Sequence, residues 1–176
     1  MLSWARFEVL SRAVLRNRQL VPPLTIHTPD GRTIRGWDYK QKKNLIIAFF
    51  DTDCAPCEEF LRALVDSAAV LREKNAVALV VFLAQPACRL TDSLPPGIIV
   101  GADMPGNSAR AFLGEDAFAS RGFVRGGVFL TDRYGELFAQ WTIERHKFPA
   151  IAEILAALDH VEMACDECST PLWAAD

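Results

Sequence analysis

The fold that we expect for this chain is decided by residues 45–64, which read LIIAFFDTDCAPCEEFLRAL. An unbroken apolar run at 45–50 is followed by small and acidic residues, then by Cys54-Ala-Pro-Cys57, and then by apolar residues at helical spacing. The apolar run predicts a buried strand, and the spacing after the cysteines predicts an amphipathic helix. The sequence therefore predicts a strand that delivers two cysteines to the start of a helix.

Two cysteines at a helix start are well placed for thiol–disulfide exchange. The thiolate is the nucleophile, and the unpaired N–H groups of a helix start favour this anion. We expect Cys54 to be the exposed nucleophile and Cys57 to lie close enough to form a reducible disulfide with it, resolving mixed disulfides. Pro56 suits a first helical turn, where its missing N–H costs nothing. The alternative is that two buried cysteines lie three residues apart by chance.

At these residues the chain resembles the thioredoxin superfamily. It is most similar to the redoxin branch, which holds the alkyl hydroperoxide reductase and thiol-specific antioxidant proteins, and to the thioredoxin-like disulfide reductases of cytochrome maturation. Residues 22–40, with TPDGR at 28–32, resemble the N-terminal hairpin of that branch, and VFLTDRYG at 128–135 resembles its later hairpin. The resemblance implies an α/β thioredoxin-like fold, a central mixed β-sheet flanked by helices, with an N-terminal helix and β-hairpin extension.

The chain departs from the thioredoxin pattern at several positions. Ala48 stands where thioredoxins carry a buried carboxylate, and Asp53 where an aromatic residue commonly precedes the nucleophile. Asp51, Glu58 and Glu59 add further negative charge near the cysteines, which disfavours a thiolate. We therefore expect Cys54 to be less acidic than a typical thioredoxin nucleophile.

The cis-proline of the family, which faces the dithiol and holds the substrate backbone, should fall just before the strand that begins near Val128. That position is occupied by Arg125-Gly126-Gly127. Glycine permits a close approach of two backbones but does not enforce one conformation. This departure argues against thioredoxin-like substrate docking, and against the activity itself.

A peroxidase is an alternative function. Peroxiredoxins carry a Pro-x-x-x-Thr-x-x-Cys pattern, but counting back from Cys54 gives Asp51 and Ile47, and counting back from Cys57 gives Cys54 and Phe50. Arg125 lies near the position of the later peroxiredoxin arginine. A peroxidase would require another way to activate peroxide.

Composition excludes several classes of protein. The chain has 176 residues, 51% of them hydrophobic, which suits one well-filled domain. A net charge of −3 makes nucleic acid an improbable partner. No run of 18 apolar residues could span a bilayer. Arginines interrupt the apolar residues of the N-terminus, so it does not resemble a secretory signal, and we expect a cytoplasmic protein. In that reducing compartment, five cysteines favour catalytic or metal-binding use.

Three regions are expected along the chain: an N-terminal amphipathic helix within residues 1–21, a thioredoxin-like domain at 22–162, and a tail at 163–176. Within the first region the helix itself is predicted over residues 3–18. The expected strands of the domain are a hairpin at 24–27 and 33–37, two strands at 76–84 and 98–100, and a pair at 127–131 and 136–143. The expected helices are one that ends near Asn75, one at 107–113 capped by Asn107 and followed by Gly114, and a last helix opened by Pro149.

A second pair, Cys165-Asp-Glu-Cys168, repeats the spacing of the first in the tail. It could be an accessory redox dithiol that exchanges with Cys54 and Cys57. It could instead bind a metal together with His160 or with the first pair. As a third possibility, Cys165 merely continues the apolar stripe of the last helix. Cys88 is expected to be buried or incidental.

The leading hypothesis is a soluble enzyme, a thioredoxin-like thiol:disulfide oxidoreductase in which Cys54, Cys57 and Pro56 form the catalytic motif. Its partners would be a protein or small-molecule disulfide and a thiol electron donor. No organic cofactor or metal is required. The competing hypotheses are a thiol peroxidase, a non-catalytic thioredoxin-fold adaptor and a metal-binding module.

Overall fold

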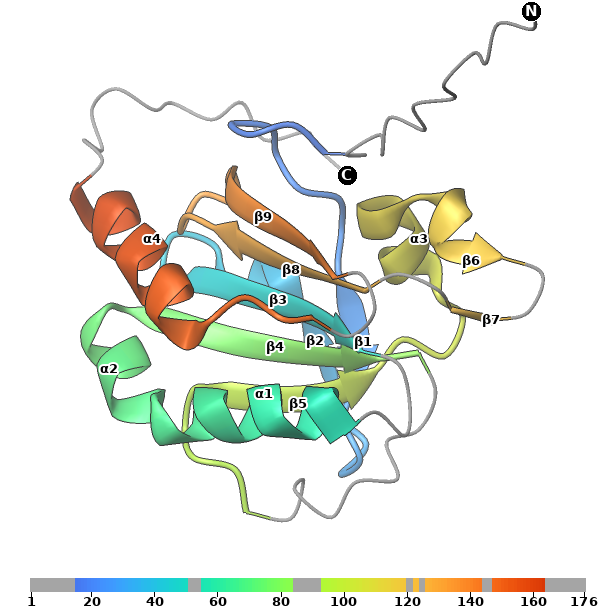
Figure 1. Cartoon of the computed structure of the whole chain (residues 1–176), viewed down its shortest axis with the longest axis horizontal. Helices are drawn as coiled ribbons and strands as arrows, with labels where there is room; N and C mark the ends of the chain where they lie inside the picture. The colour runs from blue at the N-terminus through green and yellow to red at the C-terminus, as the bar shows by residue number, and fades with distance from the viewer. Residues whose placement is uncertain are drawn as a thin grey trace, which may run out of the picture.

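The computed structural model describes residues 15–50, 55–83, 93–119, 122–123, 126–143 and 147–163. Its central element is a seven-stranded mixed sheet in the order β2-β1-β5-β4-β3-β8-β9 (Figure 1). The strands of this sheet are β1 Thr25–His27, β2 Thr33–Arg35, β3 Asn44–Phe50, β4 Ala76–Phe82, β5 Ile98–Ala102, β8 Gly126–Thr131 and β9 Leu137–Ile143. A separate pair consists of β6 Phe118–Ala119 and β7 Gly122–Phe123.

The centre of the sheet is formed by the apolar runs of the sequence. β3, β4 and β5 are parallel, and β8 lies antiparallel to β3. Every residue of β3 and of β4 is buried. Strands covered on both faces read as continuous hydrophobic runs, which is why residues 45–50 and 76–82 carry no alternating polar residues. The predicted crossover from β3 through a helix to a parallel β4 is confirmed.

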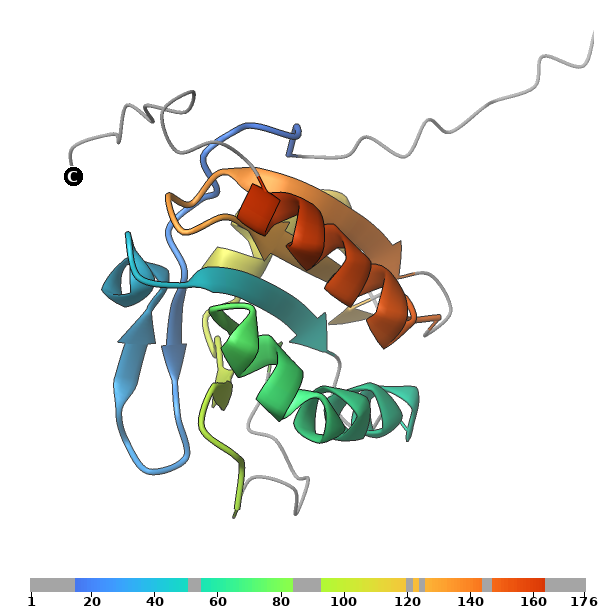
Figure 2. The same cartoon turned by 90° about the vertical axis from the view of Figure 1, so that its left-hand side faces the viewer.

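Helices cover both faces of the sheet. α1 Ala55–Asp66, α2 Ala68–Glu73 and α4 Ile151–Met163 lie over one face, as the green and red ribbons of Figure 2 show. α3 Asn107–Leu113 lies over the other face (Figure 1). Alternate residues of β3 point into the two layers: Ile46, Ala48 and Phe50 toward α1 and α4, and Leu45, Ile47 and Phe49 toward α3. The α/β class predicted from the sequence is confirmed.

The helix expected to end near Asn75 is two helices. α1 ends at Asp66 and α2 begins at Ala68, with the backbone N–H of Ser67 shared between the carbonyls of Ala63 and Leu64 at 3.2 Å each. Serine is a weak residue in a helix interior because its hydroxyl competes for backbone groups. Asn75 follows with a φ of 52°, in the left-handed region, and turns the chain into β4.

α3 has the predicted bounds but a different cap. Gly106, not Asn107, is its N-cap residue, with a φ of 68°. The cap hydrogen bond comes from farther back: the buried Asp103 accepts from the backbone N–H of Ala109 at 2.9 Å. The prediction of an Asn107 cap was wrong: Asn107 is the first residue of the helix, and Gly106, which readily adopts a positive φ, takes the cap position before it. Gly114 ends the helix as predicted.

Residues 15–21 are not helical, so the helix predicted over residues 3–18 is wrong at residues 15–18. They form a bend and a turn that run along the edge of β9. The N–H of Arg18 donates to the carbonyl of Leu137 at 2.7 Å, and the N–H of Leu137 donates to Gln19 at 2.8 Å. Backbone groups bonded to a strand edge cannot form helical bonds. The remainder of the predicted helix, residues 3–14, lies outside the described residues.

Both predicted hairpins are present, each with a turn that its residues explain. Gly31 has a φ of 83° after Pro29-Asp30, and Gly135 has a φ of 87° at the end of the β8–β9 turn. In the second turn Asp132 accepts from the N–H groups of Tyr134 and Glu136 at 2.9 Å each. Within the described ranges, no helix has the length and hydrophobicity needed to cross a membrane.

Candidate functional site

The predicted cysteine motif lies between a strand and a helix. β3 ends at Phe50 and α1 begins at Ala55, so that Pro56 lies in the first turn of α1. Proline suits this turn because its missing N–H has no helical partner to lose. Residues 51–54, including the predicted nucleophile Cys54 and the acidic Asp51 and Asp53, lie outside the described residues.

Cys57 is the third residue of α1 and is 3% exposed. Its sulfur is disulfide-bonded. The other four cysteines, Cys54, Cys88, Cys165 and Cys168, all lie outside the described part of the chain. Cys57 is thus an inward-facing, oxidised cysteine at the start of a helix.

Four phenylalanines form an aromatic cluster in the hydrophobic core that also contains Cys57. The Phe50 ring packs edge-on against Phe60, Phe82 and Phe148 at centroid distances of 5.9, 5.4 and 5.2 Å, and Phe148 stacks on Phe60 at 4.8 Å. The cluster joins the end of β3 and of β4 to α1 and to the segment before α4. It holds the start of α1, and hence Cys57, in an apolar setting that shields the sulfur from water.

Phe148 was not predicted as a site residue. Its local sequence, an apolar residue beside Pro149, is common to many helix starts and does not point to a distant strand. Only the fold brings it against Phe50 and Phe60.

Three positions that depart from the thioredoxin pattern, Ala48, Glu58 and Glu59, lie in the described part of the site. Ala48 is fully buried in β3 between Val80 and Val128, so the place of the thioredoxin carboxylate is apolar. Glu58 and Glu59 are exposed on the first turn of α1, and Glu58 forms an ion pair with Arg62 at 3.4 Å. In the described part of the site, the charges therefore stand at the surface and not beneath the sulfur.

Gly126 and Gly127 open β8 where the family's cis-proline was expected. Gly127 pairs with Phe49, near the end of β3. A Cβ atom on Gly126 would lie 2.9 Å from the carbonyl oxygen of Phe49, and one on Gly127 would lie 2.7 Å from Leu113 Cδ2. Gly126 would meet a backbone atom, which cannot move aside, so this position needs glycine, whereas Gly127 would meet the end of a flexible side chain. Arg125 lies outside the described residues.

The accessory pair Cys165 and Cys168 lies outside the described residues, so its predicted redox and metal-binding roles stay predictions. His160, its proposed metal partner, is exposed on α4, and its Nδ1 lies 2.7 Å from the carbonyl oxygen of Ala156. Among the described residues no three potential metal ligands cluster.

Comparisons with known proteins give structural matches only. No family model and no curated protein sequence matches the chain. A yeast mitochondrial 1-Cys peroxiredoxin superposes with a TM-score of 0.70 at 17% identity, covering 91% of this chain and 83% of that one. AhpC of Mycobacterium tuberculosis gives a TM-score of 0.68 at 15% identity, covering 88% and 98%.

A third structure represents the other branch of the resemblance. It is a putative thiol:disulfide interchange protein DsbE from Chlorobium tepidum, with a TM-score of 0.59 at 20% identity, covering 82% of this chain and 99% of that one. In all three pairs the match extends over most of both chains. The chain therefore has the thioredoxin-like fold, in the form shared by peroxiredoxins and thiol:disulfide interchange proteins.

Proposed function

We propose that the chain is a thiol:disulfide oxidoreductase that cycles between a Cys54–Cys57 dithiol and an internal disulfide. The observation that supports this most directly is the state of Cys57, which is disulfide-bonded and buried in the first turn of the helix that follows β3. Cys54 is the natural partner, because two residues between cysteines at a helix start bring the sulfurs within bonding reach.

The reaction proceeds in two exchanges. The Cys54 thiolate attacks one sulfur of a substrate disulfide, forms a mixed disulfide and releases the other substrate sulfur as a thiolate. The Cys57 thiolate then attacks the Cys54 sulfur and releases the second substrate thiolate. Two electrons pass from the dithiol to the substrate, and the two cysteine protons end on the two substrate thiols. A thiol electron donor reverses these steps and restores the dithiol.

The burial of Cys57 fits the second exchange. A sulfur enclosed by core residues is protected from large substrates, so it reacts with the neighbouring Cys54 and not with a second protein.

A thiol peroxidase is the second candidate, favoured by the superposition on peroxiredoxins. The Pro-x-x-x-Thr-x-x-Cys pattern is missing at both cysteines of the motif. A peroxidase would therefore have to activate peroxide without the threonine hydroxyl. This makes disulfide exchange the better-supported activity.

Insulin reduction by dithiothreitol tests the proposal. Wild type should accelerate it, Cys54→Ser should abolish the acceleration, and Cys57→Ser should trap a mixed disulfide with insulin. Cys88→Ser is the matched control and should keep wild-type activity. A Cys54→Ser variant as active as wild type would refute the proposal, and consumption of hydrogen peroxide without insulin reduction would favour the peroxidase. Insulin reduction by the double variant Cys165→Ser/Cys168→Ser, compared with wild type, shows whether the tail pair takes part in the exchange.

A further inference from the structure

A pocket of about 230 Å³ lies at the end of the sheet opposite to the cysteine motif. We call it the Trp37 pocket. Its lining includes Leu45 and Ile47 of β3, Pro22 and Pro23 of the segment before β1, and Arg35 and Trp37 at the end of the hairpin. Leu45 and Ile47 belong to the layer that packs toward α3, whereas Cys57 belongs to the layer on the other face.

The pocket exists because α3 is too short to cover its face of the sheet. α3 has seven residues, and its Phe112 packs on Phe49 at 5.3 Å, near the end of β3. The start of β3 is covered instead by residues 20–25 and by the 3-10 helix η1 Gly36–Tyr39. An irregular segment and one short helical turn fill less space than a full helix would.

The walls of the Trp37 pocket are fixed in place. The N–H of Gly36 donates to the carbonyl of Leu24, and the N–H of Val21 donates to the carbonyl of Gly135, each at 2.9 Å. Pro22 and Pro23 restrict their own backbone. A pocket held in this way exists before a ligand arrives, which lowers the entropic cost of binding.

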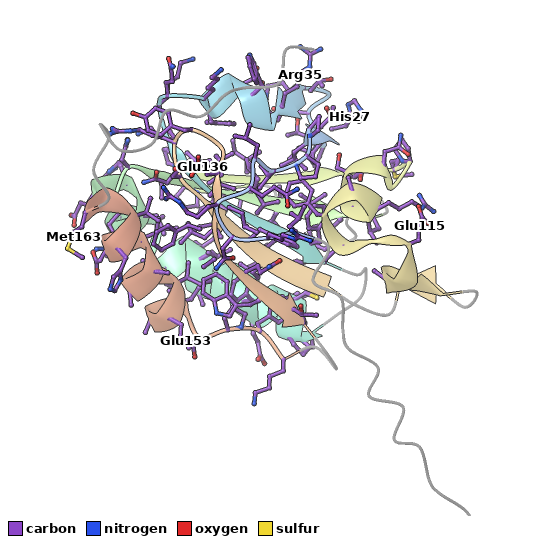
Figure 3. The ribbon with its side chains drawn as sticks, turned by 90° about the horizontal axis from the view of Figure 1, so that it is seen from above. His27, Arg35, Glu115, Glu136, Glu153 and Met163 are labelled. Atoms are coloured by element: carbon purple, nitrogen blue, oxygen red, sulfur yellow. The ribbon has the colours of Figure 1, made fainter. Side chains whose placement is uncertain are left out.

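Arg35 is the single ionisable residue among the described residues that line the pocket. Within the described part of the chain its side chain forms no ion pair, whereas Arg32 of the same hairpin pairs with Asp30 at 2.7 Å. The nearby carboxylate of Asp38 is engaged by the backbone N–H of Arg35 at 2.9 Å. Figure 3 shows Arg35 beside η1, across the molecule from Glu153 of α4.

Trp37 adds an exposed apolar surface and a second positive charge nearby. Its side chain is 51% exposed, and Lys40 Nζ lies 4.1 Å from the ring centroid. The exposed indole therefore extends the apolar surface of the pocket outward. The pocket thus combines an apolar interior with a cationic rim.

We propose that the Trp37 pocket binds an aliphatic carboxylate, whose hydrocarbon tail lies on Leu45 and Ile47 and whose carboxylate pairs with Arg35. A planar guanidinium holds a carboxylate by two parallel hydrogen bonds. Because a cavity of about 150 Å³ holds benzene, the Trp37 pocket has room for a tail of roughly eight carbons.

This site is independent of the proposed dithiol chemistry. Leu45 and Phe50 are five residues apart on one strand, which separates the pocket from the end of β3 by roughly 16 Å at about 3.3 Å per residue. Loss of Arg35 should therefore leave insulin reduction unchanged. Failure of the binding site and failure of the oxidoreductase proposal are read from different assays.

Methyl and indole NMR spectra of the full chain, titrated with octanoate, test the proposal. We expect saturable shifts at the Leu45 and Ile47 methyls and at the Trp37 indole, and a Kd about tenfold higher for Arg35→Gln. Arg32→Gln is the matched control and should bind like wild type. 1-Octanol should bind at least tenfold more weakly than octanoate, and octylammonium should not bind.

Two results would overturn the proposal. One is the absence of saturable shifts at Leu45 and Ile47. The other is an equal affinity of wild type and Arg35→Gln for octanoate, which would leave only a non-specific apolar cavity. Val21→Trp, which narrows the pocket from its wall, provides a second variant and should also weaken octanoate binding. Both variants are compared after their unligated spectra show a native fold.

Discussion

Cys57 lies both at the start of a helix and in the hydrophobic core. The helix start is held inward by Phe50, Phe60 and Phe148, and the sulfur is buried with them. On the neighbouring strand β8, Gly126 lies so close to β3 that an added Cβ atom would be 2.9 Å from the carbonyl oxygen of Phe49. At the scale of single residues, the site is shaped by the phenylalanine rings that enclose Cys57 and by the glycine that allows β8 to approach β3.

Gly126→Ala should destabilise the protein by about 1–3 kcal/mol, the usual cost of overpacking. The added Cβ would lie 2.9 Å from the carbonyl oxygen of Phe49, and a backbone atom cannot move aside as a flexible side chain can. Urea denaturation measures the loss. Gly36→Ala is the control, because its Cβ would meet Leu24 at an ordinary 3.4 Å, and equal stability losses in both variants would contradict this explanation.

Asp30 gives a pH-dependent prediction for the first hairpin. The hydrogen bond from the Thr28 hydroxyl, and then the interaction with Arg32, lower the pKa of Asp30 from its ordinary value of 3.8. A lowered pKa means that the fold favours the carboxylate, so its contribution is present above pH 3.8 and is lost as the pH falls through the lowered pKa. Thr28→Val should raise the pKa of Asp30, as followed by carboxyl NMR titration. An unchanged titration curve would show that Thr28 is not the cause.

At the scale of elements, α3 depends on a residue outside its own helix. Asp103 follows β5 and reaches the N–H of Ala109 from a buried position. The carbonyl of Asp103 also accepts from the N–H of Gly106 at 2.8 Å. One residue thus connects the end of a strand to the start of the helix that covers Phe49 and Phe129.

Asp103→Ala should therefore cost about 1–2 kcal/mol, the cost of removing a helix N-cap. Thermal unfolding provides the measurement, and hydrogen exchange should locate the loss in residues 107–113. Asp103→Asn keeps an acceptor and should lose less. If the two variants were equally destabilised, the charge and not the cap bond would be responsible.

The elements that the sequence predicted correctly are those with strong local signals. β3 and β4 are continuous apolar runs, the hairpin turns contain glycines with positive φ, and α4 carries a regular apolar stripe at Ile154, Leu158 and Val161. The site residue that it missed, Phe148, and the path of residues 15–21 along β9 depend on contacts between distant segments. The Gly106 cap and the break at Ser67 each depend on a single residue, and the regular apolar spacing on either side of Ser67 predicts a continuous helix.

At the scale of the whole molecule, residues 15–21 protect an edge of the sheet. They bond to Leu137 and place Leu15 in the core, where it is 3% exposed, and Gln140 Nε2 donates to the carbonyl of Leu15 at 2.8 Å. An uncovered strand edge is a template for pairing with another chain. The segment therefore contributes both burial and a barrier to self-association.

Removal of residues 1–21 should lower the free energy of unfolding by about 2 kcal/mol or more, from the lost burial of Leu15 and the lost bonds to β9. It should also increase self-association, as measured by analytical ultracentrifugation. Removal of residues 1–14 alone is the matched control and should leave β9 covered. A longer truncation as stable and as monodisperse as the shorter one would contradict a protective role.

The identity of the cysteine that is disulfide-bonded to Cys57 tests the proposed Cys54–Cys57 cycle most directly. Protein equilibrated in glutathione redox buffers of graded potential, alkylated, digested and analysed by mass spectrometry would identify it. We predict that oxidation joins Cys54 and Cys57, with a loss of two hydrogens, and that reduction restores both thiols over a single potential range. Cys57 joined to any other cysteine, or Cys54 and Cys57 never joined at any potential, would contradict the account.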